Sequence, residues 1–213
     1  MSLQKVHSHM ELNSVYNAES PIVWRGEYHF PDDEIDSVKE KIISLTESKE
    51  SQGVGKIYST FFIPDIYKRP EVVLLDTYKE IVSQIAIEMN FSNSEFSLNY
   101  WCQIYDGSHG AHMHYSAEII YSFVHFIRPT ERECFYFSGQ DGRKYYPKQD
   151  KGDIIVFPSI TSHGIDESYG TERMTIAGNL VFSSVMAPDD KSWCKISEIR
   201  KGLYVSEYLY NDE

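Results

Sequence analysis

Apolar positions follow a helical period in two segments of the first part of the chain, whereas the second part consists of short aromatic and β-branched runs between polar turn signals. Apolar residues recur at helical spacing, behind an acidic first turn, at Ile35, Val38, Ile42 and Leu45. A second apolar stripe predicts a helix over residues 71–89, and Pro70 just before it is typical of a helix start. Aromatic and β-branched runs at residues 21–30 and 58–63 predict strands on either side of the first helix.

The pattern changes from residue 96 onward, where short aromatic and β-branched runs alternate with turn signals. These runs cover residues 97–105, 112–128, 134–137, 145–147, 152–158 and 172–182. No helical stretch interrupts them, which predicts an antiparallel sandwich or barrel. We therefore expect a mainly β protein with flanking helices, built as a single domain over residues 1–213. Residues 1–95 would supply strands and buttressing helices, residues 96–185 the β core, and residues 186–213 a C-terminal extension.

Composition narrows the partners and the compartment. The 213 residues are 41% hydrophobic and carry a formal net charge of -12 at pH 7, which argues against binding to nucleic acid or an anionic membrane. Cys102, Cys134 and Cys194 form no Cys-x-x-Cys pair, so neither a zinc ribbon nor a disulfide framework is indicated. No apolar run reaches the ~18 residues of a membrane helix. We expect a cytoplasmic protein.

One short segment, Gly110–Glu118, concentrates potential metal ligands. On a strand, the side chains of His112, His114 and Glu118 would leave on one face, because strand side chains alternate with period two. His163 follows a buried-strand pattern far along the chain and could complete a set of three imidazoles. Such a set suits Fe, Ni, Zn or Cu. With Glu118 in place of His114, two histidines and a carboxylate would match the facial set of non-haem Fe(II) oxygenases.

A candidate anion site follows on the last predicted strand of the core. Arg173 and Thr175 share one face of that strand with Ala177 and Asn179. An arginine that points into a barrel needs a partner, because an unpaired buried charge is costly. Its planar fork suits a carboxylate, and Thr175 could add a hydroxyl donor. A metal together with a carboxylate anchor is what a chelating keto acid would use.

Other polar residues in the core are less informative. Asn99, Tyr100 and Gln103 lie on an earlier strand and could touch a cofactor, but spacing does not choose among them. His109 is expected in a loop. His125 is an odd number of residues from His112, so it is expected on the face opposite to the candidate metal ligands.

Three segments together resemble a known family: His112–His114, Gly152–His163 and Glu172–Asn179. They are similar to the Fe(II)/2-oxoglutarate-dependent dioxygenases, most closely to the prolyl-hydroxylase-like branch. The resemblance spans residues 97–182, and no motif covers residues 1–95. It implies a double-stranded β-helix core, a jelly roll of the kind that cupins share, with helices that buttress it.

The resemblance also implies roles for individual residues. His112 and His163 would be iron ligands, and Arg173 would bind the far carboxylate of 2-oxoglutarate with Thr175 beside it. The family's usual motif is His-x-Asp, whereas this chain has His-x-His, a variant that is also frequent in the related branch. His114 is the preferred third ligand, since Glu118 lies farther along the strand.

The activity that the resemblance implies is hydroxylation of a small-molecule or peptide substrate with O2, coupled to oxidative decarboxylation of 2-oxoglutarate on Fe(II). No side-chain nucleophile or general base is required. The alternative is a cupin-type metal protein, either an isomerase, a dioxygenase or a non-catalytic sensor, that does not use 2-oxoglutarate. That alternative leaves the pair of Arg173 and Thr175 unexplained. An aromatic-rich surface is compatible with a homodimer.

Overall fold

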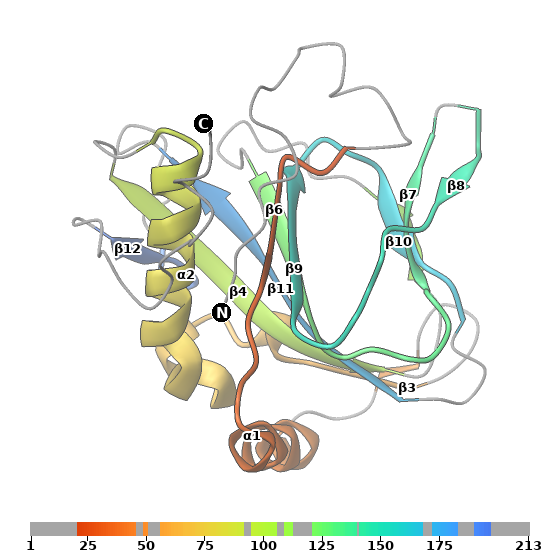
Figure 1. The fold of residues 1–213 in the computed structure, drawn as a ribbon. Helices are drawn as coiled ribbons and strands as arrows, with labels where there is room; N and C mark the ends of the chain where they lie inside the picture. Colours follow the sequence, from red (N-terminus) through yellow and green to blue (C-terminus); the bar gives the residue numbers. More distant parts are fainter. Residues whose placement is uncertain are drawn as a thin grey trace.

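The structure is a computed structural model that describes residues 21–45, 49–50, 56–91, 95–105, 109–112, 121–139, 141–167, 172–182 and 190–196. For residues 49–50, 56 and 109–112 only the main chain is described. Two antiparallel sheets face each other, and helices cover the outer side of the larger sheet (Figure 1). None of the helices in these ranges is long and apolar enough to cross a membrane.

The larger sheet, the major sheet, has the order β1-β9-β6-β11-β4-β3-β2, and β12 pairs with β4 at its edge. Its strands are β1 (Trp24–Glu27), β2 (Lys49–Glu50), β3 (Lys56–Ser59), β4 (Phe96–Tyr105), β6 (Tyr121–Arg128), β9 (Asp153–Pro158), β11 (Arg173–Val181) and β12 (Cys194–Ile196). The minor sheet has the order β5-β10-β7-β8. Its strands are β5 (His109–His112), β7 (Phe135–Ser138), β8 (Lys144–Tyr145) and β10 (His163–Ile165).

From β4 to β11 the chain passes back and forth between the two sheets. β4, β6, β9 and β11 lie in the major sheet, while β5, β7, β8 and β10 lie in the minor sheet. All these pairings are antiparallel. This alternation is the topology of a double-stranded β-helix, so the expected fold class is confirmed. The extent of a single domain over the whole chain stays a prediction, because both chain ends lie outside the described residues.

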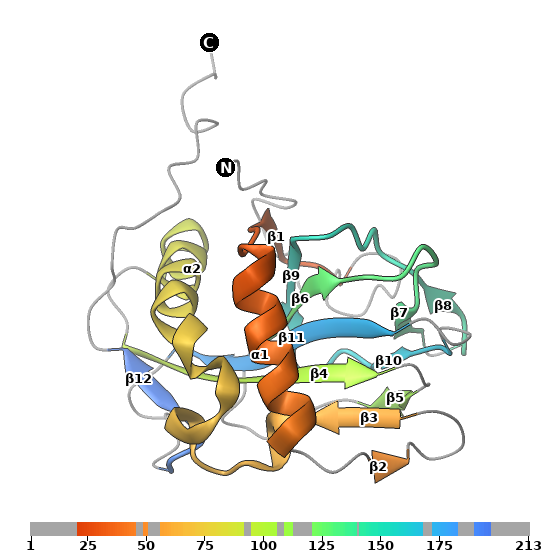
Figure 2. The ribbon, with the colours of Figure 1, turned by 90° about the horizontal axis from the view of Figure 1, so that it is seen from below.

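Two α-helices lie on the same side of the major sheet (Figure 2). α1 (Asp32–Leu45) buries Ile35, Val38 and Ile42 as its apolar spacing predicts. Leu45 was expected on the same stripe but is 65% exposed, because it is the last residue of the helix and extends past the packed face. α2 (Leu75–Glu88) follows three 3-10 turns, η2 (Thr60–Phe62), η3 (Ile66–Lys68) and η4 (Pro70–Leu74).

Two predicted boundaries are wrong for local reasons. The strand predicted over residues 58–63 ends at Ser59, whose hydroxyl accepts a hydrogen bond from the Phe61 main-chain N–H at 3.2 Å and caps a 3-10 turn. The helix predicted from residue 71 begins as the 3-10 turn η4 and becomes α-helical only at Leu75. Pro70 is the first residue of that turn, where its missing N–H is tolerated.

The outer edge of β4 is covered by two short strands and by side chains between them. β3 pairs with one end of β4 and β12 pairs with the other. In the interval, the Cys102 N–H donates to the Thr60 hydroxyl at 2.9 Å and to the Glu71 carboxylate at 3.2 Å. The Arg69 guanidinium donates to the Tyr100 carbonyl. The edge groups named here are therefore satisfied without a further strand.

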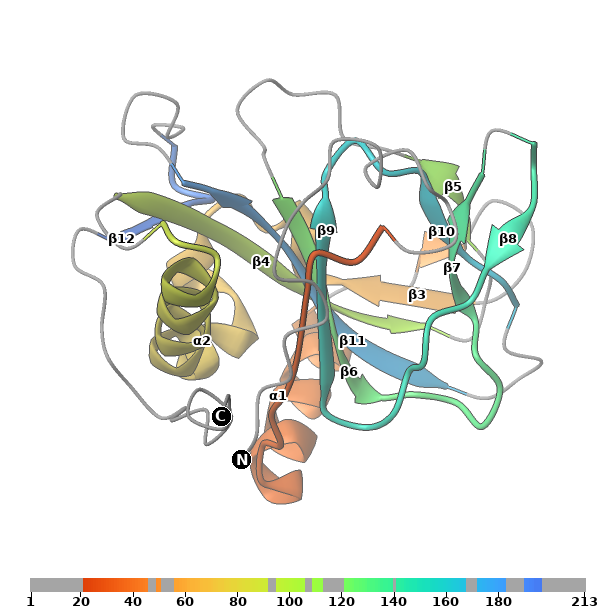
Figure 3. The same cartoon turned by 45° about the horizontal axis from the view of Figure 1, so that its top comes forward.

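The two faces of the major sheet are covered by different elements: helices lie on one face, and the minor sheet lies opposite the other (Figure 3). The helix side holds the larger apolar core, with Leu98, Ile104, Ile176 and Val156 among its members. A smaller core lies between the sheets and consists mainly of residues from β6, β7 and β9: Val124, Phe126, Phe135, Phe137, Ile155 and Phe157. The β4 and β11 side of this interior is polar instead.

Candidate functional site

The polar part of the barrel interior is formed by alternate residues of β4 and β11. On β11, Met174 and Ile176 belong to the helix-side core, which turns Arg173 and Thr175 toward the minor sheet. On β4, Ile104 belongs to the same helix-side core, which turns its neighbour Tyr105 inward. Arg173 pairs in register with Tyr105, so the arginine and the tyrosine lie next to each other on the same inner face.

Arg173 is held at the far end of β10. Its side chain is 4% exposed, and Nη2 donates to the Asp166 carbonyl at 3.0 Å, directly after the end of β10. The guanidinium carbon lies 4.4 Å from the centre of the Tyr105 ring, a cation–π contact. The Asp166 carboxylate is engaged elsewhere, with Lys144 and Tyr146 at 2.5 Å each. Burial opposes its charge, but these hydrogen bonds prevail and lower the pKa of Asp166.

Tyr105 was missed by the sequence analysis. Burial raises the pKa of its phenol, although the charge of Arg173 and a hydrogen bond with Thr175 act in the opposite direction. The residue therefore connects the two predicted anion-binding residues. The strand period alone could have found it, because Tyr105 and Gln103 share a face of β4.

Tyr100, one of three candidates named from spacing, faces the other way. Its hydroxyl donates to the Glu71 carbonyl at 2.9 Å, and its ring stacks on Tyr78 of α2 at 5.0 Å. It therefore belongs to the helix-side core. Of the three residues that could touch a cofactor, only Asn99 and Gln103 lie on the face of β4 that points into the barrel, because alternate residues of a strand face opposite sides.

His163 begins β10 and is 7% exposed. Its Nδ1 lies 2.8 Å from the Thr161 carbonyl, and because a carbonyl can only accept, Nδ1 carries the proton. In the neutral ring Nε2 is then unprotonated, which is the tautomer of a metal-binding histidine with an orienting carbonyl. The rings of Phe157 and Phe135 pack against the imidazole at 4.9 and 5.9 Å and keep its surroundings apolar.

His112 is the direct register partner of His163 across β5 and β10. Two predicted ligands that are far apart in the sequence thus occupy opposite positions of one antiparallel pair. His114 and Glu118 lie outside the described residues, so the completion of the ligand set stays a prediction. His109, expected in a loop, is instead the first residue of β5, because the strand begins earlier than its turn-rich flank indicates.

The chemistry of the described donors suits Fe(II) together with a keto acid. Imidazole ligands suit a divalent transition metal, and the proton position of His163 leaves Nε2 in the ligating form. A buried guanidinium and a threonine at the far end of β10 suit the carboxylate of a keto acid. Within the described side chains no group of three His, Cys, Asp or Glu residues comes together, and those of His112 and His114 are not among them.

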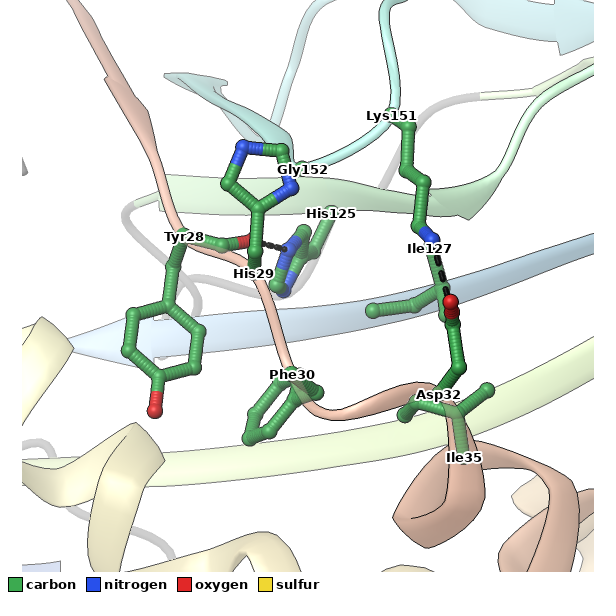
Figure 4. A pocket seen from close by; sticks show the side chains of 9 residues that line it. All are labelled: Tyr28, His29, Phe30, Asp32, Ile35, His125, Ile127, Lys151 and Gly152. Atoms are coloured by element: carbon green, nitrogen blue, oxygen red, sulfur yellow. Dashed lines mark hydrogen bonds and ion pairs between the residues drawn. The ribbon is translucent and has the colours of Figure 1, made fainter.

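A small pocket lies on the opposite side of the major sheet, where the chain enters α1 (Figure 4). Among its polar residues, Lys151 pairs with Asp32 at 2.6 Å, and the His125 Nε2 donates to the Tyr28 carbonyl at 2.9 Å. The Tyr78 hydroxyl donates a hydrogen bond to the His125 Nδ1 at 2.7 Å. The imidazole therefore belongs to the helix-side core, as its parity in the sequence indicates, and this pocket is separate from the barrel interior.

Comparisons with solved structures identify the fold. An oxidoreductase of the 2OG-Fe(II) oxygenase family from Burkholderia pseudomallei matches with a TM-score of 0.55 at 14% identity, over 79% of this chain and 87% of that chain. A prolyl-4-hydroxylase from Pseudomonas putida matches with a TM-score of 0.50 at 16% identity, over 80% of this chain and 98% of that chain. HygX from Streptomyces hygroscopicus, solved with nickel and 2-oxoglutarate, matches with a TM-score of 0.53 at 10% identity, over 81% of this chain and 87% of that chain.

This chain therefore has the fold of the 2OG-Fe(II) oxygenases, a class that includes hydroxylases. The sequence itself matches no protein-family model and no curated protein. The likeness in fold agrees with the family resemblance of the sequence, while the activity and the His-x-His variant stay predictions.

Proposed function

We propose that this protein is an Fe(II)- and 2-oxoglutarate-dependent oxygenase that hydroxylates a small-molecule or peptide substrate. The observation that carries the proposal is the register pairing of His112 with His163 in a barrel that also buries Arg173 at the far end of β10. The shared fold with 2OG-Fe(II) oxygenases supports it, as does a neighbour that holds nickel and 2-oxoglutarate.

In this proposal His112, His114 and His163 hold the metal. Arg173 binds the far carboxylate of 2-oxoglutarate, and the hydroxyls of Thr175 and Tyr105 complete the anion site. Bound Fe(II) and 2-oxoglutarate would supply the O2-dependent oxidative decarboxylation that delivers an oxygen atom to a C–H bond.

The chain's own contribution is orientation and the exclusion of water. The Thr161 carbonyl fixes the tautomer and the tilt of the His163 ring. Phe157 and Phe135 shield that ring from water on the side of the smaller core. The Tyr105 ring and the Asp166 carbonyl fix the plane of the Arg173 guanidinium, which limits the directions from which a carboxylate can bind.

The cupin-type alternative, a metal protein without 2-oxoglutarate, differs in what it requires of Arg173. It assigns no ligand to an arginine at this position. Substitution of Arg173 therefore separates the two functions.

The test is an anaerobic titration of the Fe(II)-loaded protein with 2-oxoglutarate, followed by the weak visible charge-transfer band of the chelate. The wild type should develop the band, and Arg173→Ala should need at least about tenfold more 2-oxoglutarate, since a charge-assisted hydrogen-bond pair is lost. Arg128→Ala is the matched control, because Arg128 is a part-exposed arginine that pairs with Asp36 on the outside of the sheet.

A wild-type protein that binds Fe(II) without developing the band would contradict the oxygenase proposal and favour the cupin-type alternative. An equal loss in Arg173→Ala and Arg128→Ala would show that the titration responds to a general loss of charge or fold. The same titration with Tyr105→Phe measures the contribution of the phenol hydroxyl and keeps the ring under the guanidinium.

A further inference from the structure

Three neutral N–H donor groups lie together on the inner face of the major sheet, beyond the residues assigned above. Asn99 and Asn179 are direct register partners on β4 and β11. Trp101 comes two residues after Asn99 on β4, and its own partner is Ala177 on β11. The exposed fractions are 8% for Asn99, 4% for Asn179 and 7% for Trp101.

The two asparagine side chains are held in a defined orientation. The Arg69 Nη1 donates to the Asn99 Oδ1 at 2.9 Å, and because a guanidinium has no acceptor, the amide oxygen must face Arg69. Ser122 on β6 donates to the Asn179 Oδ1 at 2.9 Å. Both amide oxygens are therefore engaged, and neither Asn99 nor Asn179 donates from its amide nitrogen to another described residue.

Trp101 adds a third donor and an apolar neighbour. Its indole N–H is buried and has no hydrogen-bond partner among the described residues. The ring makes an edge contact with Phe61 at 5.1 Å, and Phe61 makes another with Phe62 at 5.6 Å. Phe61 and Phe62 are 49% and 62% exposed, so an apolar surface leads from the solvent to the buried indole.

The register of the strands connects this cluster to the predicted metal site. Asn99, Asn179 and Ser122 form one row across three strands, and Phe157 on β9 continues it as the partner of Ser122. The ring of Phe157 packs on His163 at 4.9 Å. The row therefore lies at the end of the barrel where β10 begins.

Arg173 lies at the other end of β11. Asn179 is six positions farther along the strand, a rise of roughly 20 Å at about 3.3 Å per residue. In the proposed function both ends of 2-oxoglutarate are already held, the far carboxylate by Arg173 and the other end by the metal. The donors of Asn99, Trp101 and Asn179 are therefore left for a different molecule.

The buried indole N–H of Trp101, which has no acceptor among the described residues, carries a desolvation cost that a ligand with a matching acceptor removes. We propose that Asn99, Trp101 and Asn179 form a substrate subsite for the carbonyl oxygen of an amide, with Phe61 and Phe62 in contact with the apolar group attached to it. The substrate class is then an N-acylated amino acid or a peptide. This inference rests on the proposed oxygenase function for the reaction, although the subsite can be tested without turnover.

An amide is favoured over a carboxylate because the three donors are neutral. The cation next to them, Arg69, lies behind Asn99 and has Glu71 beside it at the β4 edge. An additional buried anion would lack a compensating positive charge, whereas a neutral carbonyl needs only donors.

The test follows the side-chain N–H signals by NMR in the full-length, 15N-labelled protein loaded with Zn(II), which is redox-inactive. The chain has three tryptophans, so Trp101→Phe assigns the indole signal, and Asn179→Asp assigns one of the amide pairs. N-acetyl-phenylalaninamide is the probe, and 3-phenylpropanoate, which carries the same benzyl group next to a carboxylate, is the control. The expected result is that the amide shifts the signals of Trp101, Asn99 and Asn179, while the carboxylate at equal concentration does not.

The variants test the donors one by one. Asn179→Asp replaces an N–H donor by an acceptor of the same shape and should weaken amide binding about tenfold or more. Asn90→Asp makes the same exchange at an exposed position and should leave binding unchanged. Trp101→Phe keeps an aromatic ring but removes the N–H, and it should also weaken binding of the amide probe. This variant tests the proposal even if Asn179→Asp does not fold.

Three outcomes would overturn the subsite: no shift with the amide, equal or tighter binding of the carboxylate, or the same three signals shifted by 2-oxoglutarate itself. Failure of the proposed function has a different signature, because Arg173→Ala should leave the binding of the amide probe intact. A protein that binds the amide but develops no 2-oxoglutarate band keeps the subsite and loses the oxygenase proposal. The reverse pattern keeps the oxygenase and removes the subsite.

Discussion

The two faces of the major sheet treat polar side chains in opposite ways. On the helix side, His125 is fully buried, and both its ring nitrogens have partners within the chain, the Tyr78 hydroxyl and the Tyr28 carbonyl. On the barrel side, Asn99 and Asn179 are nearly as buried, yet their amide N–H groups have no acceptor among the described residues. The same strands thus bury a fully paired histidine on one face and the proposed binding groups on the other.

This difference teaches how to distinguish structural from functional polar residues in a sheet with two covered faces. Burial alone does not separate them, since His125 is buried more completely than Asn179. The two kinds of residue differ in their hydrogen-bond partners. A structural polar group bonds to other groups of the chain, whereas a binding group keeps N–H donors without an acceptor in the chain.

The largest effect should come from a matched pair of neighbours on β11. Ile176→Ala removes a fully buried side chain from the helix-side core and should lower the free energy of unfolding by about 2–5 kcal/mol, with 2-oxoglutarate binding retained. Thr175→Ala, one residue away on the other face, should cost about 1 kcal/mol and weaken 2-oxoglutarate binding. Urea unfolding and the anaerobic titration measure the two quantities. Equal losses of stability would contradict the distinction between the faces.

A smaller destabilisation is expected from Gly178→Ala, where the sheet leaves no room for a side chain. A Cβ at Gly178 would lie 2.3 Å from the Phe123 Cε1 and 2.5 Å from the Asn99 main-chain oxygen. The ring can move but the strand carbonyl cannot, so the substitution should cost about 1–3 kcal/mol. Thermal unfolding measures the loss. An unchanged melting temperature would mean that the close approach of β4 and β11 at this position is not maintained.

The pH dependence of stability should reveal the dry character of the helix side. Burial lowers the pKa of His125 to about 3, below its ordinary value near 6.5. Between these values the unfolded chain binds a proton that the folded chain does not, so the stabilising contribution is complete above about pH 6.5 and decreases as the pH falls. The slope is about 1.4 kcal/mol per pH unit. His125→Gln should remove this component of the slope, as urea unfolding at several pH values would measure; an identical slope would contradict it.

The smallest effect is expected where the barrel side reaches the surface. Lys144 is 40% exposed and pairs with the Asp166 carboxylate, so Lys144→Ala should cost less than about 1 kcal/mol of stability. The Asp166 main-chain carbonyl, which contacts Arg173, is untouched, and 2-oxoglutarate binding should persist. A large loss of binding in this variant would mean that the side chain of Asp166 also positions the arginine.

Much of the fold could be predicted because its signals are periodic. Aromatic and β-branched runs between turn signals predict β4, β6, β9 and β11, and the 3.6-residue spacing predicts α1 and α2. The 3-10 turn after Ser59 could not be predicted in this way, since it depends on one capping hydroxyl rather than on a period. The exposure of Leu45 depends on where α1 leaves the sheet, which spacing does not encode.

The site was predictable in its residue types and less so in its arrangement. The pairing of His112 with His163 depends on strand register, which the turns and loops of the whole barrel determine. The orientation of Tyr100 toward α2 and of Tyr105 toward Arg173 follows from which face of β4 meets the helices. Spacing shows which residues share a face of the strand, but only the packing of the helices and sheets decides which face points into the barrel.

The covered edge of β4 has a consequence for the behaviour of the protein in a crowded solution. An exposed stretch of central strand is a template on which a strand of another molecule can assemble. Here Thr60, Arg69 and Glu71 occupy the interval between β3 and β12 and bond to the main chain of β4 there. Loss of these side chains would leave unpaired main-chain groups on a strand edge, so they are expected to limit edge-to-edge association of the folded protein as well as to stabilise the sheet.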